Sequence, residues 1–206
     1  MDHQQRIIQV AEEMFMRYGI RSVTMDEIAK ELSISKKTIY QHFRDKDDIV
    51  LQVGRKVFED ERMQISTCEA VAENVIHELF LMSQSVREHI DNANPSVLHD
   101  LQKYYPAAWQ EYQAFKQFCL QKILSILQKG IDKGYFWDDM QPEVLARLRT
   151  EEIELVFNQA TFPREQFDAK KVQMQLLEHF IRGILTPQGQ KLYRQYTEKL
   201  SPHESL

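Results

Sequence analysis

The stretch "SISKKTIYQHFRDKDDI", residues 33–49, decides how the N-terminal part of this chain folds. Ser35 stands where a short helix would begin and can cap it. Lys36 and Lys37 then fall in the first helical turn, where unpaired N–H groups and the helix dipole disfavour cations. A local violation in an otherwise consistent sequence is typical of a functional site, so we expect an anionic partner opposite these two lysines.

The segment before this stretch predicts two more helices. Apolar residues recur every three or four positions from Ile7 to Tyr18, and Gly19 is suited to end that helix. Thr24 and Glu27 form a capping box that opens the second helix. That second helix obeys the dipole rule that the third one violates, and only a short turn separates them.

Two features complete a helix-turn-helix plan. Ile39 and Phe43 are the expected inward-facing residues of the third helix, which leaves its other side chains exposed. Asp45 caps a fourth helix, expected from Lys46 to about Gln64. In such a plan the second helix of the motif meets base edges and phosphates, so the missing anion is predicted to be DNA phosphate.

The gross composition fits this prediction. The chain has 206 residues and a formal net charge of −5, so its cations are concentrated locally rather than on average. Prolines begin only at Pro95 and are then spaced by about one helix and a turn, while period-two apolar runs are absent, which predicts an all-α fold. Cys68 and Cys119 show no ligand-like spacing, and no apolar run approaches the roughly 20 residues of a membrane span. We therefore expect a cytosolic protein with no membrane partner, no cofactor, no metal and no catalytic residues.

The segment "GIRSVTMDEIAKELSISKKTIYQHFRDKDDIVLQV", residues 19–53, resembles the DNA-binding segment of the tetracycline-repressor (TetR-like) family of bacterial transcriptional regulators. Residues 127–148 are similar to the stretch that leads into the family's eighth helix, and residues 180–189 resemble the end of its ninth helix. The resemblance implies about nine or ten helices. It implies a helix-turn-helix head over residues 1–46, a connecting fourth helix over 46–64, and a ligand-binding and dimerisation domain over 47–206.

Carried over residue by residue, the resemblance implies a set of DNA contacts. The expected phosphate contacts are Thr24, Ser35, Tyr40, His42 and Lys46, and the residues expected near base edges are Lys36, Lys37, Thr38 and Gln41. The sequence departs from the family at Ser33 and Lys37, where relatives often carry Gly. Lys37 adds a donor that could reach guanine, so the operator cannot be copied from relatives.

The C-terminal part carries two further expectations. Apolar stripes are typical of a core, but the family dimerises through its last two major helices, which implies an interface of Leu145, Leu148, Leu176, Leu177, Phe180, Ile181 and Ile184. Nine of the chain's 21 aromatic residues lie between residues 104 and 137. They suit either plain core packing or the wall of a ligand pocket, for which the candidates are Tyr105, Trp109, Tyr112, Phe115 and Phe118.

These features predict a homodimeric repressor that a small, largely apolar effector releases from a pseudo-palindromic operator in double-stranded DNA. A ligand-independent or partner-controlled regulator with a solid C-terminal core is the alternative, and an all-α enzyme is a remote one. The fourth helix is the expected lever between effector and DNA. Gly54 within it suits close packing or bending.

Overall fold

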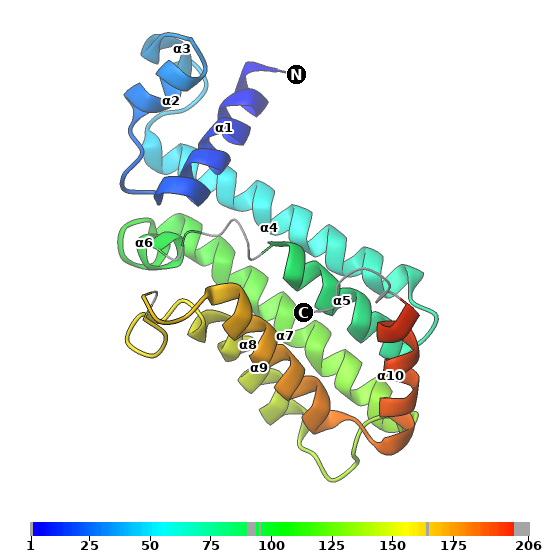
Figure 1. Ribbon diagram of the computed structural model, residues 1–206. Helices are drawn as coiled ribbons and strands as arrows, with labels where there is room; N and C mark the ends of the chain where they lie inside the picture. The colour runs from blue at the N-terminus through cyan, green and yellow to red at the C-terminus, as the bar shows by residue number, and fades with distance from the viewer. Residues whose placement is uncertain (1, 90–93, 95, 164, 200–206) are drawn as a thin grey trace. The chain divides into compact units, whose positions relative to one another are not determined.

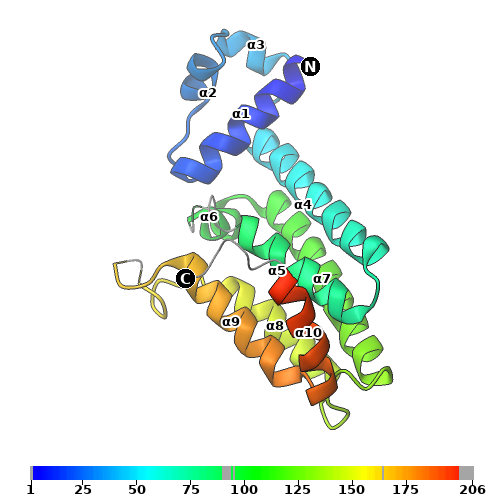
Figure 2. The ribbon, with the colours of Figure 1, turned by 45° about the vertical axis from the view of Figure 1, so that its right-hand side comes forward.

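The chain folds into α-helices, as the computed structural model shows for residues 2–89, 94, 96–163 and 165–199 (Figures 1 and 2). The helices of this described part are α1 (His3–Tyr18), α2 (Met25–Glu31), α3 (Lys36–Tyr40), α4 (Lys46–Val71), α5 (Val75–His89), α6 (Ser96–Tyr104), α7 (Pro106–Asp132), α8 (Pro142–Leu155), α9 (Ala169–Ile184) and α10 (Pro187–Lys199). Within the described residues the only β feature is an isolated bridge between Phe136 and Leu185. The predicted all-α fold of about nine or ten helices is therefore confirmed.

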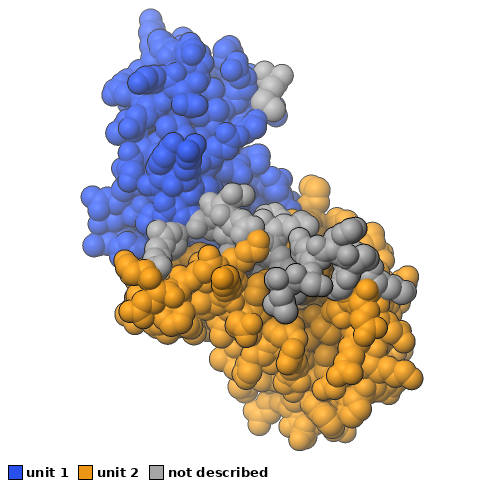
Figure 3. All heavy atoms as spheres, viewed as in Figure 1, with its two compact units in different colours: residues 1–62, 92–115 blue, residues 63–91, 116–206 orange. Residues whose placement is uncertain are grey.

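Two compact units divide the chain (Figure 3). Unit 1 comprises residues 1–62 and 92–115, and unit 2 comprises residues 63–91 and 116–206. Helices α4 and α7 each contribute residues to both units. These two units are defined by the packing of the chain. The boundary expected at residue 46 instead separates the DNA-binding part from the ligand-binding part, and it stays a prediction.

Unit 1 is built around the buried faces of α1, α2, α3 and the first part of α4. Its core contains Ile7, Ala11, Phe15, Ile28, Ile39, Phe43, Ile49, Val50 and Val53, together with Leu101, Tyr105 and Ala108 from the segment of α6 and α7. The apolar periodicity of the first 53 residues therefore indicated the correct faces. An ion pair between Lys56 Nζ and Glu12 Oε2, 3.0 Å apart, ties α4 to α1 along the edge of this core.

Helix α4 continues seven residues beyond the expected end at Gln64. The reason lies in unit 2, where Glu69 forms ion pairs with Lys122 and with Lys129 of α7. These partners hold the pKa of Glu69 at about 2, mainly through hydrogen bonds from the two ammonium groups. The last part of α4 is thus held by ion pairs with residues far along the chain.

Unit 2 has its own hydrophobic core, to which α5, α7, α8, α9 and α10 contribute. Its buried members include Ile76, Phe80, Leu127, Phe136, Ala146, Leu177, Phe180, Ile181, Ile184 and Tyr193. Figures 1 and 2 both show α8 and α9 side by side. Helix α10 packs on α5, where the rings of Tyr196 and His77 stack with centroids 4.6 Å apart.

The two C-terminal stretches that resemble the family meet each other in unit 2. Thr186 N–H donates to the Tyr135 carbonyl at 2.9 Å, and Trp137 N–H donates to the Ile184 carbonyl at 3.1 Å. Gly189 permits this approach, because a Cβ built there would lie 2.2 Å from the Tyr135 carbonyl oxygen. The similarity of these stretches thus corresponds to one structural junction.

No helix among the described residues has the length and apolar character needed to cross a membrane.

Candidate DNA-binding surface

Helix α2 is fixed at its start by the predicted capping box. Thr24 Oγ1 accepts from Glu27 N–H at 3.2 Å, and the Glu27 carboxylate accepts from Thr24 N–H at 2.7 Å. These hydrogen bonds hold the pKa of Glu27 below its usual value, first through the backbone of Thr24 and then through its side chain. The capping box predicted from the sequence is present.

The turn after α2 is a Schellman motif. Ser33 N–H donates to the Lys30 carbonyl and Ile34 N–H donates to the Ala29 carbonyl, both at 3.0 Å. Ser33 occupies the left-handed position of this motif with φ 54°, which Gly usually fills. The departure from the family at this residue therefore leaves the turn intact and adds backbone strain.

Helix α3 is short and is anchored at both ends. Ser35 Oγ accepts from Thr38 N–H at 3.1 Å, which is the predicted N-cap. Ile39 and Phe43 are buried in the core of unit 1, so the rest of the segment faces outward. Asp45 Oδ1 accepts from Asp48 N–H at 2.8 Å and caps α4 as predicted.

Most of the predicted DNA-contact residues are exposed in unit 1. Thr24, Ser35, Lys36, Lys37, Tyr40, Gln41 and His42 are exposed, whereas Thr38 and Lys46 are partly buried. Tyr40 is the largest of them and is 51% exposed. The hydroxyl group of this exposed tyrosine is therefore available to a partner.

The expectation that both lysines of α3 lack an anionic partner within the chain was wrong for Lys36. Its Nζ lies 3.0 Å from Asp26 Oδ2 of α2. The hydrogen bond to Asp26 raises the pKa of Lys36. Exposed pairs of this kind are weak, so DNA phosphate could replace Asp26 at little cost. Within the described residues no ion pair is found for Lys37, so its exposed ammonium group is available to an external anion.

Lys46 is directed into unit 1 rather than outward. Its Nζ donates to the Ile20 carbonyl at 2.6 Å, which ties the start of α4 to the turn after α1. Desolvation lowers the pKa of this lysine, opposed by the charges of Asp100 and Asp47. Sequence reasoning missed this structural role, and the phosphate contact of Lys46 stays a prediction.

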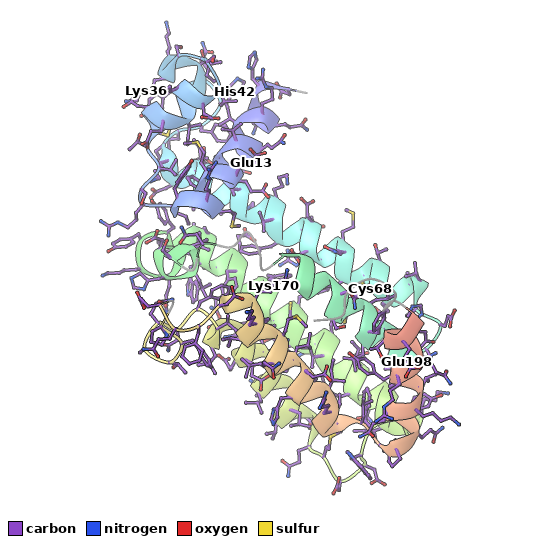
Figure 4. The ribbon with its side chains drawn as sticks, in the orientation of Figure 1. Glu13, Lys36, His42, Cys68, Lys170 and Glu198 are labelled. Carbon is purple, nitrogen blue, oxygen red and sulfur yellow. The ribbon has the colours of Figure 1, made fainter. Side chains whose placement is uncertain are left out.

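His42 lies beside the first turn of α1 (Figure 4), where its ring stacks on that of His3 with centroids 6.2 Å apart. Both imidazoles remain exposed. His42 is therefore available at the edge of the surface formed by α3, as a phosphate contact requires.

Sequence reasoning also missed a connection between α6 and the turn after α1, within unit 1. Asp100 Oδ2 accepts from Arg21 N–H at 3.1 Å, and Arg21 Nη1 donates to Tyr104 Oη at the same distance. The Arg21 guanidinium also lies 4.5 Å from the centre of the Tyr104 ring. These partners are 79 and 83 residues apart in sequence, so no local pattern could have indicated them.

The candidate effector residues lie mainly in the packing of unit 1. Tyr105 is buried. Phe115 stacks on Phe58 with ring centroids 5.4 Å apart, and the tilted ring of Tyr112 lies 5.7 Å from that of Phe58. Trp109 stacks on Tyr112 at 5.1 Å. Phe118 belongs instead to unit 2, where Lys122 Nζ lies over its ring. The aromatic run is thus split, and four of its five candidates pack in the core of unit 1; their pocket role stays a prediction.

The expected interface residues are also split between two environments. Leu177, Phe180, Ile181 and Ile184 are buried in the chain's own core, which leaves them no surface for a second copy. Leu145 and Leu176 are partly buried, and Leu148 is 51% exposed. Sequence periodicity identified an apolar stripe on α9 but could not separate its core side from its outer side.

The described residues contain no group of three or more His, Cys, Asp or Glu side chains able to hold a metal ion. The site consists instead of a capped helix pair with a strained turn and an outward side rich in hydrogen-bond donors. This arrangement defines a helix-turn-helix head.

Comparison with known proteins agrees with this geometry. Residues 7–53 match the family model described as "Bacterial regulatory proteins, tetR family". A curated HTH-type transcriptional regulator of Staphylococcus aureus is 40% identical over 53 residues, which span 26% of this chain and 29% of that relative. Residues 7–53 thus resemble the DNA-binding part of TetR-family regulators, and the stretch matched to the curated relative spans less than a third of either chain.

Solved structures share the fold over most of the chain. A TetR-family transcriptional regulator from Agrobacterium tumefaciens superposes with a TM-score of 0.73 at 17% identity, covering 89% of this chain and 97% of that one. A putative regulator from Saccharomonospora viridis, solved in complex with choline, has a TM-score of 0.68 at 21% identity over the same shares. At these identities the likeness shows the fold alone.

Proposed function

We propose that the chain is a homodimeric transcriptional regulator that binds a pseudo-palindromic operator through α3. The observation that carries the proposal is that seven predicted contact residues are exposed, six of them between residues 35 and 42, whereas Ile39 and Phe43 are buried in the core of unit 1. In this proposal the exposed Lys37 and Gln41 contact base edges, and the exposed Tyr40 and His42 contact phosphates. Such a protein acts in the cytoplasm, where operator DNA is found.

The dimer is proposed to form through the outer face of α8 and α9. Val144 and Leu148 of α8 are 55% and 51% exposed, one helical turn apart. On α9, Gly183 is exposed, and a Cβ built there would meet nothing within 4 Å. Gly183 lies in the last turn of α9, and no packing among the described residues explains a glycine there. A second copy approaching closely at Gly183 gives it a role.

Dimerisation serves DNA binding by geometry. A dimer presents two copies of α3, and helix-turn-helix dimers place them about one DNA turn, roughly 34–36 Å, or more apart. Two half-sites are then contacted at once, so the second contact benefits from a high effective concentration. The operator should therefore be an inverted repeat.

We propose that the regulator is a repressor released by a small effector, with α4 as the route of the signal. Helix α4 begins beside α3 in unit 1, and its far end is held in unit 2 by the ion pairs of Glu69. Within unit 1, α6 is joined to the turn after α1 through Asp100 and Arg21. In this proposal, a movement of α4 or of α6 is transmitted through these contacts to the DNA-binding surface.

A ligand-independent or partner-controlled regulator is the second candidate. It is favoured by the packing of Tyr112 and Phe115 against Phe58 and of Trp109 against Tyr112, which resembles a solid core rather than an open pocket. The two candidates share the DNA-binding head, so they differ only in the effector.

Selection from a pool of randomised DNA duplexes tests the DNA-binding proposal, because every possible operator sequence is present in the pool. We expect the purified protein to enrich an inverted repeat, and we expect affinity for it to fall steeply with salt because binding releases counterions. A variant with Lys37→Ala should select a sequence altered at one position of each half-site. A pool that shows no enrichment after repeated rounds would contradict the proposal.

A further inference from the structure

One polar side chain in unit 2 is buried without a hydrogen-bonding partner. Gln173 of α9 is 1% exposed, and within the described part of the chain neither its Nε2 nor its Oε1 has a partner. A buried amide without partners is strongly unfavourable, because its hydrogen bonds to water are lost and nothing replaces them. Native proteins contain few such groups, so this one needs a reason.

The side chain of Gln173 lies on the buried face of α9. It shares the buried face of α9 with Leu177, Phe180 and Ile184, spaced at helical intervals. Its amide therefore points to the same side as the core residues and not to solvent. A polar group on this face lies in an apolar environment. A hydrogen bond is strong there, and a missing hydrogen bond is costly.

The neighbouring helix supplies charge without supplying a partner. On α8, Arg149 is 4% exposed and its Nη1 lies 3.2 Å from Glu152 Oε2, which is also buried. The Arg149 guanidinium lies 5.8 Å from the centre of the Phe180 ring, which places this ion pair against the buried face of α9. Because the two charges compensate each other, the pair does not select an ion of either sign.

The chemistry of an amide restricts what can bind it. Gln173 offers two donors on Nε2 and one acceptor on Oε1, and within the described residues both atoms lack partners. A carboxylate can only accept and an ammonium can only donate, so either one would leave half of the amide unsatisfied. A neutral group that both donates and accepts, such as an amide or a hydroxyl, satisfies both atoms.

We propose that Gln173 is the polar anchor of an effector site on the α8–α9 wall of unit 2, and that the effector is an uncharged amphiphile with an apolar body and an amide or hydroxyl head. The inference rests on the proposed function as an effector-controlled regulator. It places the anchor outside the aromatic run of residues 104–137.

Thermal melting of three proteins tests the anchor: the wild type, Gln173→Leu, and Gln175→Leu as a control on the exposed side of the same helix. Leu has a volume similar to that of Gln and needs no hydrogen bond, so Gln173→Leu should melt about 4 °C higher than the wild type without ligand. Gln175→Leu should melt close to the wild type. If Gln173→Leu melts below the wild type, the amide has partners in the folded chain and the proposal is wrong.

The same proteins are then melted with 1-octanol and octanamide, and with octanoate and octylammonium as charged counterparts of equal chain length. We expect the two neutral probes to raise the melting temperature of the wild type and of Gln175→Leu, but not that of Gln173→Leu. Absent shifts, equal shifts in all three proteins, or larger shifts with a charged probe would overturn the proposal.

Operator binding by the same three proteins distinguishes a failure of the Gln173 anchor from a failure of the proposed DNA-binding function. We expect Gln173→Leu to bind the selected operator as tightly as the wild type but to lose release by octanamide. If all three proteins bind operator and the probes do not discriminate between them, the anchor is wrong and the regulator stands. If none binds any selected duplex, the proposed function itself fails.

Discussion

Replacing Ser33 by Gly should stabilise the helix-turn-helix head. Ser33 stands at the left-handed position of the Schellman motif between α2 and α3, with φ 54°, and it is the only described residue other than Gly with a positive φ. Its side chain is exposed, so the substitution removes no buried contact. The backbone hydrogen bonds of Ser33 and Ile34 to the end of α2 do not involve that side chain.

The magnitude follows from two opposing terms. An L-residue in the left-handed region costs roughly 1–2 kcal/mol, which Gly does not incur. Gly also gains freedom in the unfolded chain, which offsets about 0.4–1 kcal/mol of that benefit. The net gain is about 0.5–1 kcal/mol, or an increase in the melting temperature of about 1–4 °C for a chain of this size.

Differential scanning calorimetry of Ser33→Gly against Ser22→Gly measures this gain. Ser22 is an exposed residue of the turn before α2 that does not have a positive φ, so Gly there only adds unfolded-state freedom and should lower the melting temperature slightly. Both variants should keep DNA binding. If Ser33→Gly melts at or below Ser22→Gly, the turn is not strained and the reasoning is refuted.

Three further predictions concern other parts of the chain. Gly54→Ala should raise the melting temperature by about 2–4 °C, because the new Cβ would make ordinary contacts with Phe58 at 3.5 Å and Ala108 at 3.9 Å while Ala favours the helix; a decrease would indicate that α4 must bend there. Leu148→Asp should give a folded monomer in light scattering, because Leu148 is half exposed, whereas Phe180→Asp should unfold the chain; an intact Leu148→Asp dimer would place the interface elsewhere. Glu69→Gln should melt below the wild type at neutral pH. Since the folded pKa of Glu69 is about 2, below its usual value of 4.5, its contribution is present above pH 4.5 and should vanish as the pH falls towards 2; a difference that persists at pH 2 would mean that charge is not the cause.

Local chemistry in the head was predictable from the sequence because its determinants are close together. Thr24 and Glu27 are three residues apart, as are Asp45 and Asp48, and their capping bonds are present. Ile39 and Phe43 were assigned to the core by spacing alone and are buried. Short-range hydrogen bonds and apolar periodicity can be read without the tertiary fold.

Contacts between distant segments could not be predicted in the same way. The end of α4 depends on Lys122 and Lys129, and the position of Lys46 Nζ depends on the carbonyl of Ile20. The predicted interface failed to separate Phe180 from Leu148, because a stripe on a helix indicates burial but not what covers it. The unpaired amide of Gln173 likewise becomes visible only when the buried face of α9 is known.

The central claim, that the outward side of α3 binds operator DNA, is tested most directly by fluorescence anisotropy with the selected duplex at several salt concentrations. The proteins compared are the wild type, Lys37→Ala, and Lys191→Ala as an exposed lysine control on α10. Removal of a base contact should weaken operator binding of Lys37→Ala by about 1–3 kcal/mol, and if the same ammonium group also neutralises a phosphate, the log–log salt slope should fall by about 0.9. Lys191→Ala should bind as the wild type does. Equal affinities and equal slopes for all three proteins would contradict the account.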